Sequence, residues 1–189
     1  MAEVAEVVKI GLTGIPGVGK TETLLKIVRR LEEKGIIIGG MVTEPIIEGS
    51  QRAGFSITDW KTKKQGVLAH KDFDSELEVS GYKVNVEDLE SIGVPAILDA
   101  IETCDLVIVD EVGKMEMCSD AFIDAVRKLL DSDRCVLMTL HKKSRHPLLQ
   151  DIRRRDDVRI IEVTKMGKTI LYSQIAPVFE EYFAKHKRM

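Results

Sequence analysis

The sequence predicts an α/β protein, a three-layer sandwich in which helices cover both faces of a mostly parallel, five-stranded central sheet. Short apolar runs rich in β-branched residues alternate with amphipathic helical patterns over most of the 189 residues, as crossover helices between parallel strands require. A glycine-rich loop joins the first apolar run to the first helical pattern. A chain of this length buries roughly 70% of the surface that it exposes when unfolded, so we expect one domain spanning residues 1–189.

The expected elements follow in order along the chain. The strands are expected at 7–13, 36–42, 106–110, 135–140 and 158–163. The helices are expected at 20–34, 86–102, 120–131, 147–154 and 173–186. Pro147 suits the first position of its helix, where a missing N–H is not needed, so His146 is expected to open that helix.

Residues 43–83 interrupt this rhythm. The segments 54–60 and 65–69 alternate apolar and polar residues on either side of the polar turn 61–64. Such alternation is typical of an antiparallel hairpin with one face in water. We therefore expect a small antiparallel hairpin insert, without a core of its own, beside or above the functional site.

The loop between the first strand and the first helix fits the pattern G-x-x-x-x-G-K-[ST]. Its residues are Gly14, Ile15, Pro16, Gly17, Val18, Gly19, Lys20 and Thr21. Glycines let backbone N–H groups turn inward around a triphosphate, and the following helix adds its unpaired N–H groups and its positive dipole end. Lys20 is expected to reach the β- and γ-phosphates, and Thr21 to place its hydroxyl on Mg²⁺. The alternative is a glycine-rich turn without a ligand.

A second half of the site is predicted at the end of the apolar strand 106–110. Ligands of open parallel sheets sit at the carboxyl ends of the strands, so Asp110 and Glu111 are expected to face the glycine loop. Asp110 suits Mg²⁺, a hard cation that prefers oxygen ligands. Glu111 can orient or deprotonate the water that attacks the γ-phosphate. A helix cap or a surface turn is the structural alternative for these two acids.

Several other residues are candidates with open roles. Thr139, near the end of the next strand, could contact the γ-phosphate or could be a satisfied strand threonine, and Glu116 could support the site or lie on the surface. His141 and His146 lack a second pair of ligands at zinc spacing. Four arginines could contact the transition state, and the sequence does not choose among them: Arg52, Arg153, Arg154 and Arg155.

Composition narrows the classes of partner. The net charge of −3 gives no general attraction to nucleic acid, although 142–145 and 153–155 are local basic clusters for which a solvated face is the simpler interpretation. The three widely spaced cysteines suggest free thiols. The sequence has no apolar run long enough for a membrane helix. Residues 1–6 are acidic and do not resemble a signal peptide. We expect a cytoplasmic protein, and we favour a monomer over an oligomer. The scarcity of Asn and Gln beside 31% charged residues is typical of heat-adapted proteins.

Five segments in this order resemble the small P-loop nucleoside-triphosphatases found in thermophiles and, in animals, called the cancer-related nucleoside-triphosphatase. They are Gly14 to Thr21, Arg52-Ala53-Gly54-Phe55, Tyr82-Lys83-Val84-Asn85, the run Asp110-Glu111-Val112-Gly113-Lys114-Met115-Glu116, and His146-Pro147. The run from Asp110 to Glu116 is the most specific of them. The likeness covers nearly the whole chain.

The resemblance implies a P-loop NTPase fold in which an extra strand separates the phosphate-loop strand from the acidic strand. It also implies slow, Mg²⁺-dependent hydrolysis of ATP, GTP, CTP and UTP with loose base selectivity. Lys20, Thr21, Asp110 and Glu111 fall on the family's matching positions. One departure is Met166-Gly167-Lys168, where the family is expected to carry an asparagine-arginine pair, so no nucleotide contact is carried over to this segment.

Two other functions share the same loop. A nucleotide or small-molecule kinase would place an acceptor where the water sits and would need a second pocket, which the insert could supply, although Arg52 is its only arginine. A nucleotide-switched protein could bind nucleic acid through the two basic clusters. The glutamate directly after Asp110 favours water as the acceptor and hence a hydrolase.

Overall fold

The structure is a computed structural model that describes residues 6–186, so the expectation about a signal peptide at residues 1–6 lies almost wholly outside it. Within this range nine strands form one sheet in the order β5-β6-β4-β3-β2-β7-β8-β1-β9. The strands are β1 (Lys9–Gly14), β2 (Ile38–Glu48), β3 (Gln51–Asp59), β4 (Gln65–His70), β5 (Glu78–Val79), β6 (Tyr82–Val84), β7 (Leu106–Val112), β8 (Cys135–His141) and β9 (Arg159–Glu162).

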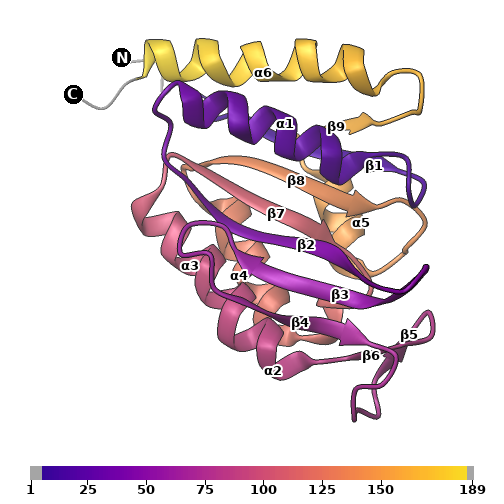
Figure 1. Cartoon of the computed structure of the whole chain (residues 1–189). Helices are drawn as coiled ribbons and strands as arrows, with labels where there is room; N and C mark the ends of the chain where they lie inside the picture. The colour runs from indigo at the N-terminus through magenta and orange to yellow at the C-terminus, as the bar shows by residue number, and fades with distance from the viewer. Residues whose placement is uncertain (1–5, 187–189) are drawn as a thin grey trace.

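Helices cover both faces of this sheet, which gives the three layers that the sequence predicts (Figure 1). They are α1 (Lys20–Glu33), α2 (Val86–Asp88), the π-helical turn η1 (Leu89–Gly93), α3 (Val94–Thr103), the short 3₁₀ turn η2 (Glu116–Cys118), α4 (Asp120–Asp131), α5 (Pro147–Arg154) and α6 (Lys168–Lys185). The single helix expected at 86–102 is thus α2, η1 and α3 in succession. Asn85 begins it by accepting a hydrogen bond from the Asp88 N–H.

The parallel half of the sheet matches the prediction. The strands β2, β7, β8, β1 and β9 run parallel, and β8 lies between the glycine-loop strand β1 and the acidic strand β7. One apolar cluster packs β1 against α1 and α6, and a second packs the opposite face against α3, α4 and α5. Since both faces are covered, these strands are apolar along nearly their whole length.

The insert forms the predicted hairpin, β3 and β4, around the turn at 60–64, but it does not stand apart from the sheet. β2 continues to Glu48 instead of ending near residue 42, and β3 pairs antiparallel with this extension. The short strands β5 and β6, which were not predicted, then add to β4. The expected five-stranded sheet is therefore the parallel part of a larger mixed sheet.

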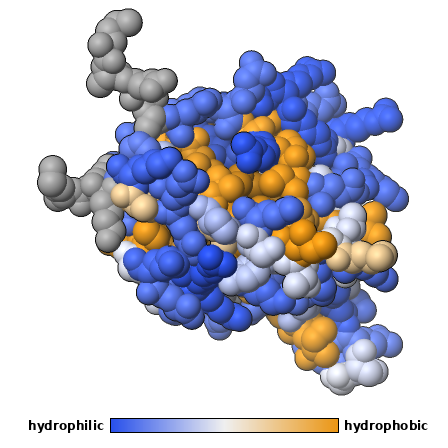
Figure 2. Space-filling view, turned by 90° about the horizontal axis from the view of Figure 1, so that it is seen from above, coloured by the Kyte–Doolittle hydropathy of each residue, from blue (hydrophilic) through white to orange (hydrophobic). Residues whose placement is uncertain are grey.

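The last helix begins earlier than predicted, at Lys168 instead of residue 173. Its first turns are not clearly amphipathic: Ile170 is 59% exposed, whereas Ile175 and Phe179 are buried against α1. Apolar side chains also show among hydrophilic ones on the face that α6 covers, seen from above in Figure 2. The helical period was therefore visible only in the second half of α6. No helix within residues 6–186 combines the length and the apolar character needed to cross a bilayer.

Candidate functional site

The glycine loop lies where β1 ends and α1 begins, at the edge of the sheet where the parallel strands end (Figure 1). Gly17 and Gly19 have φ angles of 76° and 105°, in the left-handed region that glycine adopts without strain. Val18 between them is buried and anchors the loop to the core. Gly19 caps α1 without a side-chain hydrogen bond, so the first N–H groups of the helix face the loop uncapped. These N–H groups can donate hydrogen bonds to a bound anion.

Lys20 joins the two halves of the predicted site. Its Nζ donates to the Gly14 carbonyl oxygen at 2.8 Å and lies 3.4 Å from Glu111 Oε2. The lysine side chain is 10% exposed and the glutamate side chain 27%. The structure thus brings the loop lysine and the second acid together, as the sequence predicts.

Asp110 is buried at the end of β7 and receives two hydroxyl hydrogen bonds on one oxygen. Thr21 and Thr139 donate to Asp110 Oδ1 at 3.1 Å and 2.6 Å. Thr139 therefore has a partner within the chain, in line with the structural alternative for it. Burial raises the pKa of Asp110 to about 6, against the effect of the two hydroxyls. Its other oxygen, Oδ2, is buried without a hydrogen-bond partner.

An orphaned carboxylate oxygen beside a threonine hydroxyl fits a hard divalent cation. Residues 6–186 contain no cluster of three or more His, Cys, Asp or Glu side chains that could enclose a metal. A site with one carboxylate and one hydroxyl leaves the remaining positions to phosphate oxygens and water, which is the usual arrangement for Mg²⁺. The donor set formed by Thr21 and Asp110 therefore suits Mg²⁺ bound together with a nucleotide.

Glu116 is 4% exposed, so it is not a surface residue. A Cβ atom at Gly113 would lie 2.8 Å from Glu111 Oε1 and 2.8 Å from Glu116 Oε2, so both carboxyls approach this turn closely. Burial, and then the charge of Glu111, raise the pKa of Glu116 to about 8. Near neutral pH Glu116 is therefore mostly uncharged.

Of the four candidate arginines, only Arg52 lines the cleft described below. Arg153 donates to the carbonyl oxygens of Ser144, His141 and Lys142 at 2.9, 2.7 and 3.1 Å. Arg155 pairs with Asp157 and Asp131. Arg154 is exposed on α5.

Arg153 thus holds the loop 141–146 in place instead of pointing at a phosphate. His146 opens α5 as expected, since its Nδ1 accepts from the Leu148 N–H at 3.2 Å. His141 lies in the cleft, and burial lowers its pKa.

These residues meet in a cleft of about 550 Å³ at the carboxyl ends of the strands. The glycine loop, Asp110, Glu111 and Glu116 form one part of it, and side chains of the insert form another. Lys114, Lys142 and Lys143 also line it. The sequence interpretation missed Lys142 and Lys143 because it took 142–145 as a solvated cluster. The signal was available, because these two lysines directly follow the end of β8, Lys114 follows the end of β7, and the same edge rule applies to all three.

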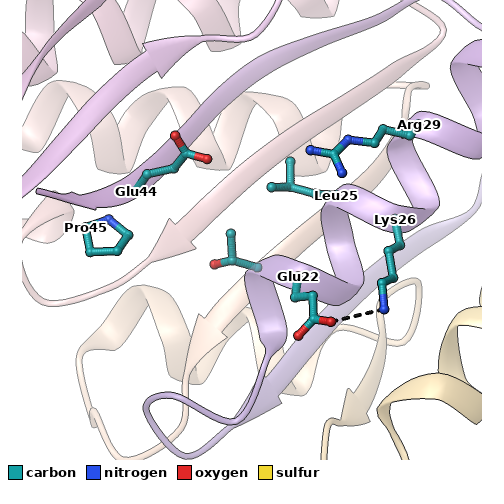
Figure 3. A pocket seen from close by; sticks show the side chains of 7 residues that line it. Glu22, Leu25, Lys26, Arg29, Glu44 and Pro45 are labelled. Carbon is teal, nitrogen blue, oxygen red and sulfur yellow. Dashed lines mark ion pairs between the residues drawn. The ribbon is translucent and has the colours of Figure 1, made fainter. Parts of the chain in front are cut away.

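A smaller cavity of about 500 Å³ adjoins this cleft between α1 and β2. Figure 3 shows Glu44 and Pro45 of β2 across from Leu25, Lys26 and Arg29 of α1. Thr21 and Pro45 line both cavities, so the two are neighbours. The segment after β9 also approaches the loop, through Lys168. Lys168 Nζ pairs with Glu22 Oε2 at 2.7 Å. A Cβ atom built at Gly19 would lie 3.2 Å from the Cδ atom of Lys168.

The glycine loop, the separated acidic strand and the parallel sheet define a P-loop NTPase. Residues 9–176 match the model of the NTPase family, and the chain belongs to this family. It is 42% identical over 166 residues to the nucleoside-triphosphatase THEP1 of Thermofilum pendens, which covers 87% of this chain and 91% of the relative. This membership identifies the chain as an enzyme of the nucleoside-triphosphatase class.

Two solved structures share the fold. THEP1 from Aquifex aeolicus superimposes with a TM-score of 0.83 at 34% identity, over 92% of this chain and 99% of that one. A human cancer-related nucleoside triphosphatase gives a TM-score of 0.79 at 29% identity, over 97% and 100% of the two chains. The family resemblance stated from the sequence motifs is confirmed.

Proposed function

We propose that this enzyme hydrolyses nucleoside triphosphates to the diphosphate and phosphate in a Mg²⁺-dependent reaction, with water directed by Glu111. The observation that carries the proposal is the 3.4 Å approach of Lys20 Nζ to Glu111 Oε2. A lysine that contacts the phosphates and a carboxylate that can take a proton thus lie side by side. Such a pair suits attack by water on a bound γ-phosphate.

The loop supplies the binding energy for the phosphates. Its backbone N–H groups and the uncapped start of α1 face the anion, and Lys20 neutralises charge that develops on the β- and γ-phosphates. Thr21 and Asp110 would hold Mg²⁺, which when bound neutralises phosphate charge and fixes the phosphate geometry. The orphaned Asp110 Oδ2 supports this assignment.

Glu111 positions the attacking water and accepts its proton. The water oxygen forms a bond to the γ-phosphorus while the bond from that phosphorus to the β–γ bridging oxygen breaks, and the electron pair leaves with the diphosphate. Glu111 is partly exposed, so water can reach it. Glu116 is held neutral by burial.

The segment after β9 supports loose selectivity among ATP, GTP, CTP and UTP, because two of its side chains do not form a pocket for a particular base. Met166 is 93% exposed, and the Lys168 side chain is engaged with Glu22. A nucleic-acid switch is disfavoured because the guanidinium groups of Arg153 and Arg155 contact their own chain. The free cysteines suit the cytoplasm.

The test is phosphate release from ATP, GTP, CTP and UTP with and without Mg²⁺, for the native enzyme and two variants. Glu111→Gln should still bind nucleotide but lose most of its turnover, by about a hundredfold or more. Lys20→Ala should weaken both binding and turnover. Arg127→Gln, an exposed change on α4, serves as the matched control. Native turnover in Glu111→Gln would show that another group directs the water.

A further inference from the structure

The end of β8 lies between the two halves of the site. In the sheet, β8 is flanked by the glycine-loop strand β1 and the acidic strand β7 (Figure 1). Its last residue, His141, pairs in register with Gly14, the first residue of the glycine loop. The residue before it, Leu140, pairs with Val112, which directly follows Glu111. The sheet therefore fixes the backbone of His141 at a point between the loop and the acids.

The His141 side chain leaves the strand on the face that carries the site. Thr139 lies two residues earlier, so the two side chains point to the same side of the sheet. The Thr139 hydroxyl is buried and donates to Asp110 at 2.6 Å. His141 is the next side chain on this face, and it lines the cleft together with Lys20 and Glu111. Because the Thr139 hydroxyl is already engaged, His141 is the side chain of β8 that faces the space for a phosphate.

A hydrogen bond within the chain fixes the tautomer of the His141 ring. Nδ1 accepts from the backbone N–H of Ser144 at 3.1 Å, so Nδ1 carries no proton. A neutral ring must then carry its proton on Nε2. Within residues 6–186, Nε2 of His141 has no hydrogen-bond partner. The ring therefore has one N–H group left to donate.

The surroundings of His141 favour this neutral form. Burial lowers the pKa of the ring below its usual value. Glu111 opposes this effect, whereas three positive charges add to it, those of Lys114, Lys20 and Arg153. Near neutral pH the ring is therefore uncharged, and its Nε2–H is a neutral donor.

A second histidine with the same Nδ1 bond shows how His141 differs. In His70, Nδ1 accepts from the Asp72 N–H at 3.1 Å, and Nε2 lies 3.1 Å from Glu48 Oε1. His70 thus has a partner within the chain at both ring nitrogens, and it does not line the cleft. His141 has a partner at one nitrogen only and lies where a phosphate would bind. The unused donor of His141 therefore suits a ligand.

We propose that His141 is a catalytic residue of the hydrolase, and that its Nε2–H donates a hydrogen bond to an oxygen of the γ-phosphate during transfer. The inference rests on the proposed function, which places the γ-phosphate beside Lys20 and Glu111. A donor that is already in place stabilises the charge on the γ-phosphoryl oxygens without reorganisation. Since the ring is neutral, it does this without adding a further cation to a cleft that already holds several lysines.

The tautomer also separates the role of His141 from that of Glu111. A general base needs a free lone pair. In His141 the lone pair of Nδ1 accepts from Ser144, and Nε2 carries the proton. The Nε2–H bond of His141 therefore stays intact through the step, and Glu111 takes the proton of the water.

Binding of a transition-state analogue tests the assignment without turnover. Isothermal titration calorimetry measures the affinity for Mg²⁺ and ADP with and without aluminium fluoride, which mimics the γ-phosphoryl group in transfer. His141→Asn keeps an oxygen that can accept from the Ser144 N–H but loses the donor in the cleft. It should bind ADP within about twofold of native and lose about tenfold or more of the tightening that aluminium fluoride gives.

Two further variants separate the donor from the shape of the site. His141→Gln keeps an N–H donor near the position of Nε2 and should recover part of the lost tightening. His70→Asn makes the same change as His141→Asn at the histidine outside the cleft, and it should match native in both measurements. In steady state, His141→Asn should lower kcat for ATP about tenfold or more and change the KM by less than about threefold.

Nitrogen NMR of the histidine rings gives a readout that needs neither turnover nor affinity. The His141 signals, assigned by their absence in His141→Gln, should show an unprotonated Nδ1 and a protonated Nε2. The Nε2–H signal should move when Mg²⁺, ADP and aluminium fluoride are added together. The His70 signals should stay in place.

The outcomes distinguish this assignment from the hydrolase itself. No phosphate release from ATP by the native enzyme would refute the hydrolase. Native phosphate release together with undiminished aluminium fluoride tightening in His141→Asn, or with an unmoved Nε2–H signal, would overturn the role of His141 and leave the hydrolase intact. Weaker ADP binding in both His141 variants would assign the ring to the shape of the site and would also overturn the proposal.

Discussion

The parallel and antiparallel parts of the sheet differ in what fixes their structure. In the parallel part, β1 and β7 are mostly apolar. β1 leads into the glycine loop, and β7 carries the two acids near its end. In the antiparallel part, β3 exposes Gln51 and Arg52 at its start and buries Ile57 further along, so its burial changes along the strand. The first part holds the loop and the acids that we propose for the phosphate chemistry, and the second lines the cleft beside them. Substitutions in the two parts should therefore affect different properties.

Asp110→Asn should have the largest effect, a loss of activity without a loss of stability. The amide keeps an oxygen for Thr21 and Thr139 but cannot serve as a charged cation ligand, so Mg²⁺-dependent turnover should fall by about a hundredfold or more. The unfolding free energy at pH 7 should stay equal or rise, since burial opposes the charge of Asp110. Phosphate release and urea unfolding measure the two effects. Unchanged Mg²⁺ dependence would refute the assignment of Asp110.

The sequence predicts the parallel part because its signals are local. A buried strand between two helical layers must be apolar throughout, and a loop that wraps a triphosphate must place glycine at positions such as Gly17 and Gly19. The position of β8 between β1 and β7 came only from the family resemblance. No local pattern reports which strands become neighbours.

The antiparallel part was predicted less completely because pairing over distance decides it. The segment around Pro45 does not look like a strand, yet β2 runs through it because β3 lies alongside. β5 has two residues and β6 three, too short for any period to show. The role of Arg153 was equally invisible, because its three carbonyl partners belong to a loop whose shape the sequence does not reveal.

Arg153→Gln should have the next largest effect, because it frees the loop 141–146 that carries Lys142 and Lys143 into the cleft. If these cleft lysines contact the phosphates equally in the bound substrate and in the transition state, the KM for ATP should rise about tenfold while kcat changes less. Arg153→Lys keeps a donor and should restore part of the loss. Arg154→Gln, exposed on the same helix, is the control. A fall in kcat at constant KM would instead place Arg153 in the transition state.

Glu116→Gln should change how stability depends on pH. The pKa of Glu116 is raised from 4.5 to about 8 in the folded enzyme, so the folded state holds a proton that the unfolded chain releases. Its contribution to stability is complete below pH 4.5 and is lost as the pH rises toward 8. The slope from one proton cannot exceed about 1.4 kcal/mol per pH unit.

Urea unfolding from pH 5 to 8.5, without nucleotide or Mg²⁺, measures this slope. The native enzyme should lose stability as the pH rises, and Asp110, whose pKa is raised to about 6, contributes in the same direction at the lower end. Glu116→Gln should flatten the curve above about pH 6. An identical slope in both proteins would show that Glu116 is already ionised in the folded state.

Phe55→Leu should have the smallest effect on hydrolysis and marks the boundary between the two parts of the sheet. It removes the edge-to-face contact with Tyr82 and the ring beneath Arg52, so the unfolding free energy should fall by about 1 kcal/mol. Phosphate release from ATP alone should stay within about twofold of native, since no loop residue or acid depends on this ring. A large loss of hydrolysis would mean that the antiparallel part also holds the γ-phosphate, and the separation of roles between the two parts would fail.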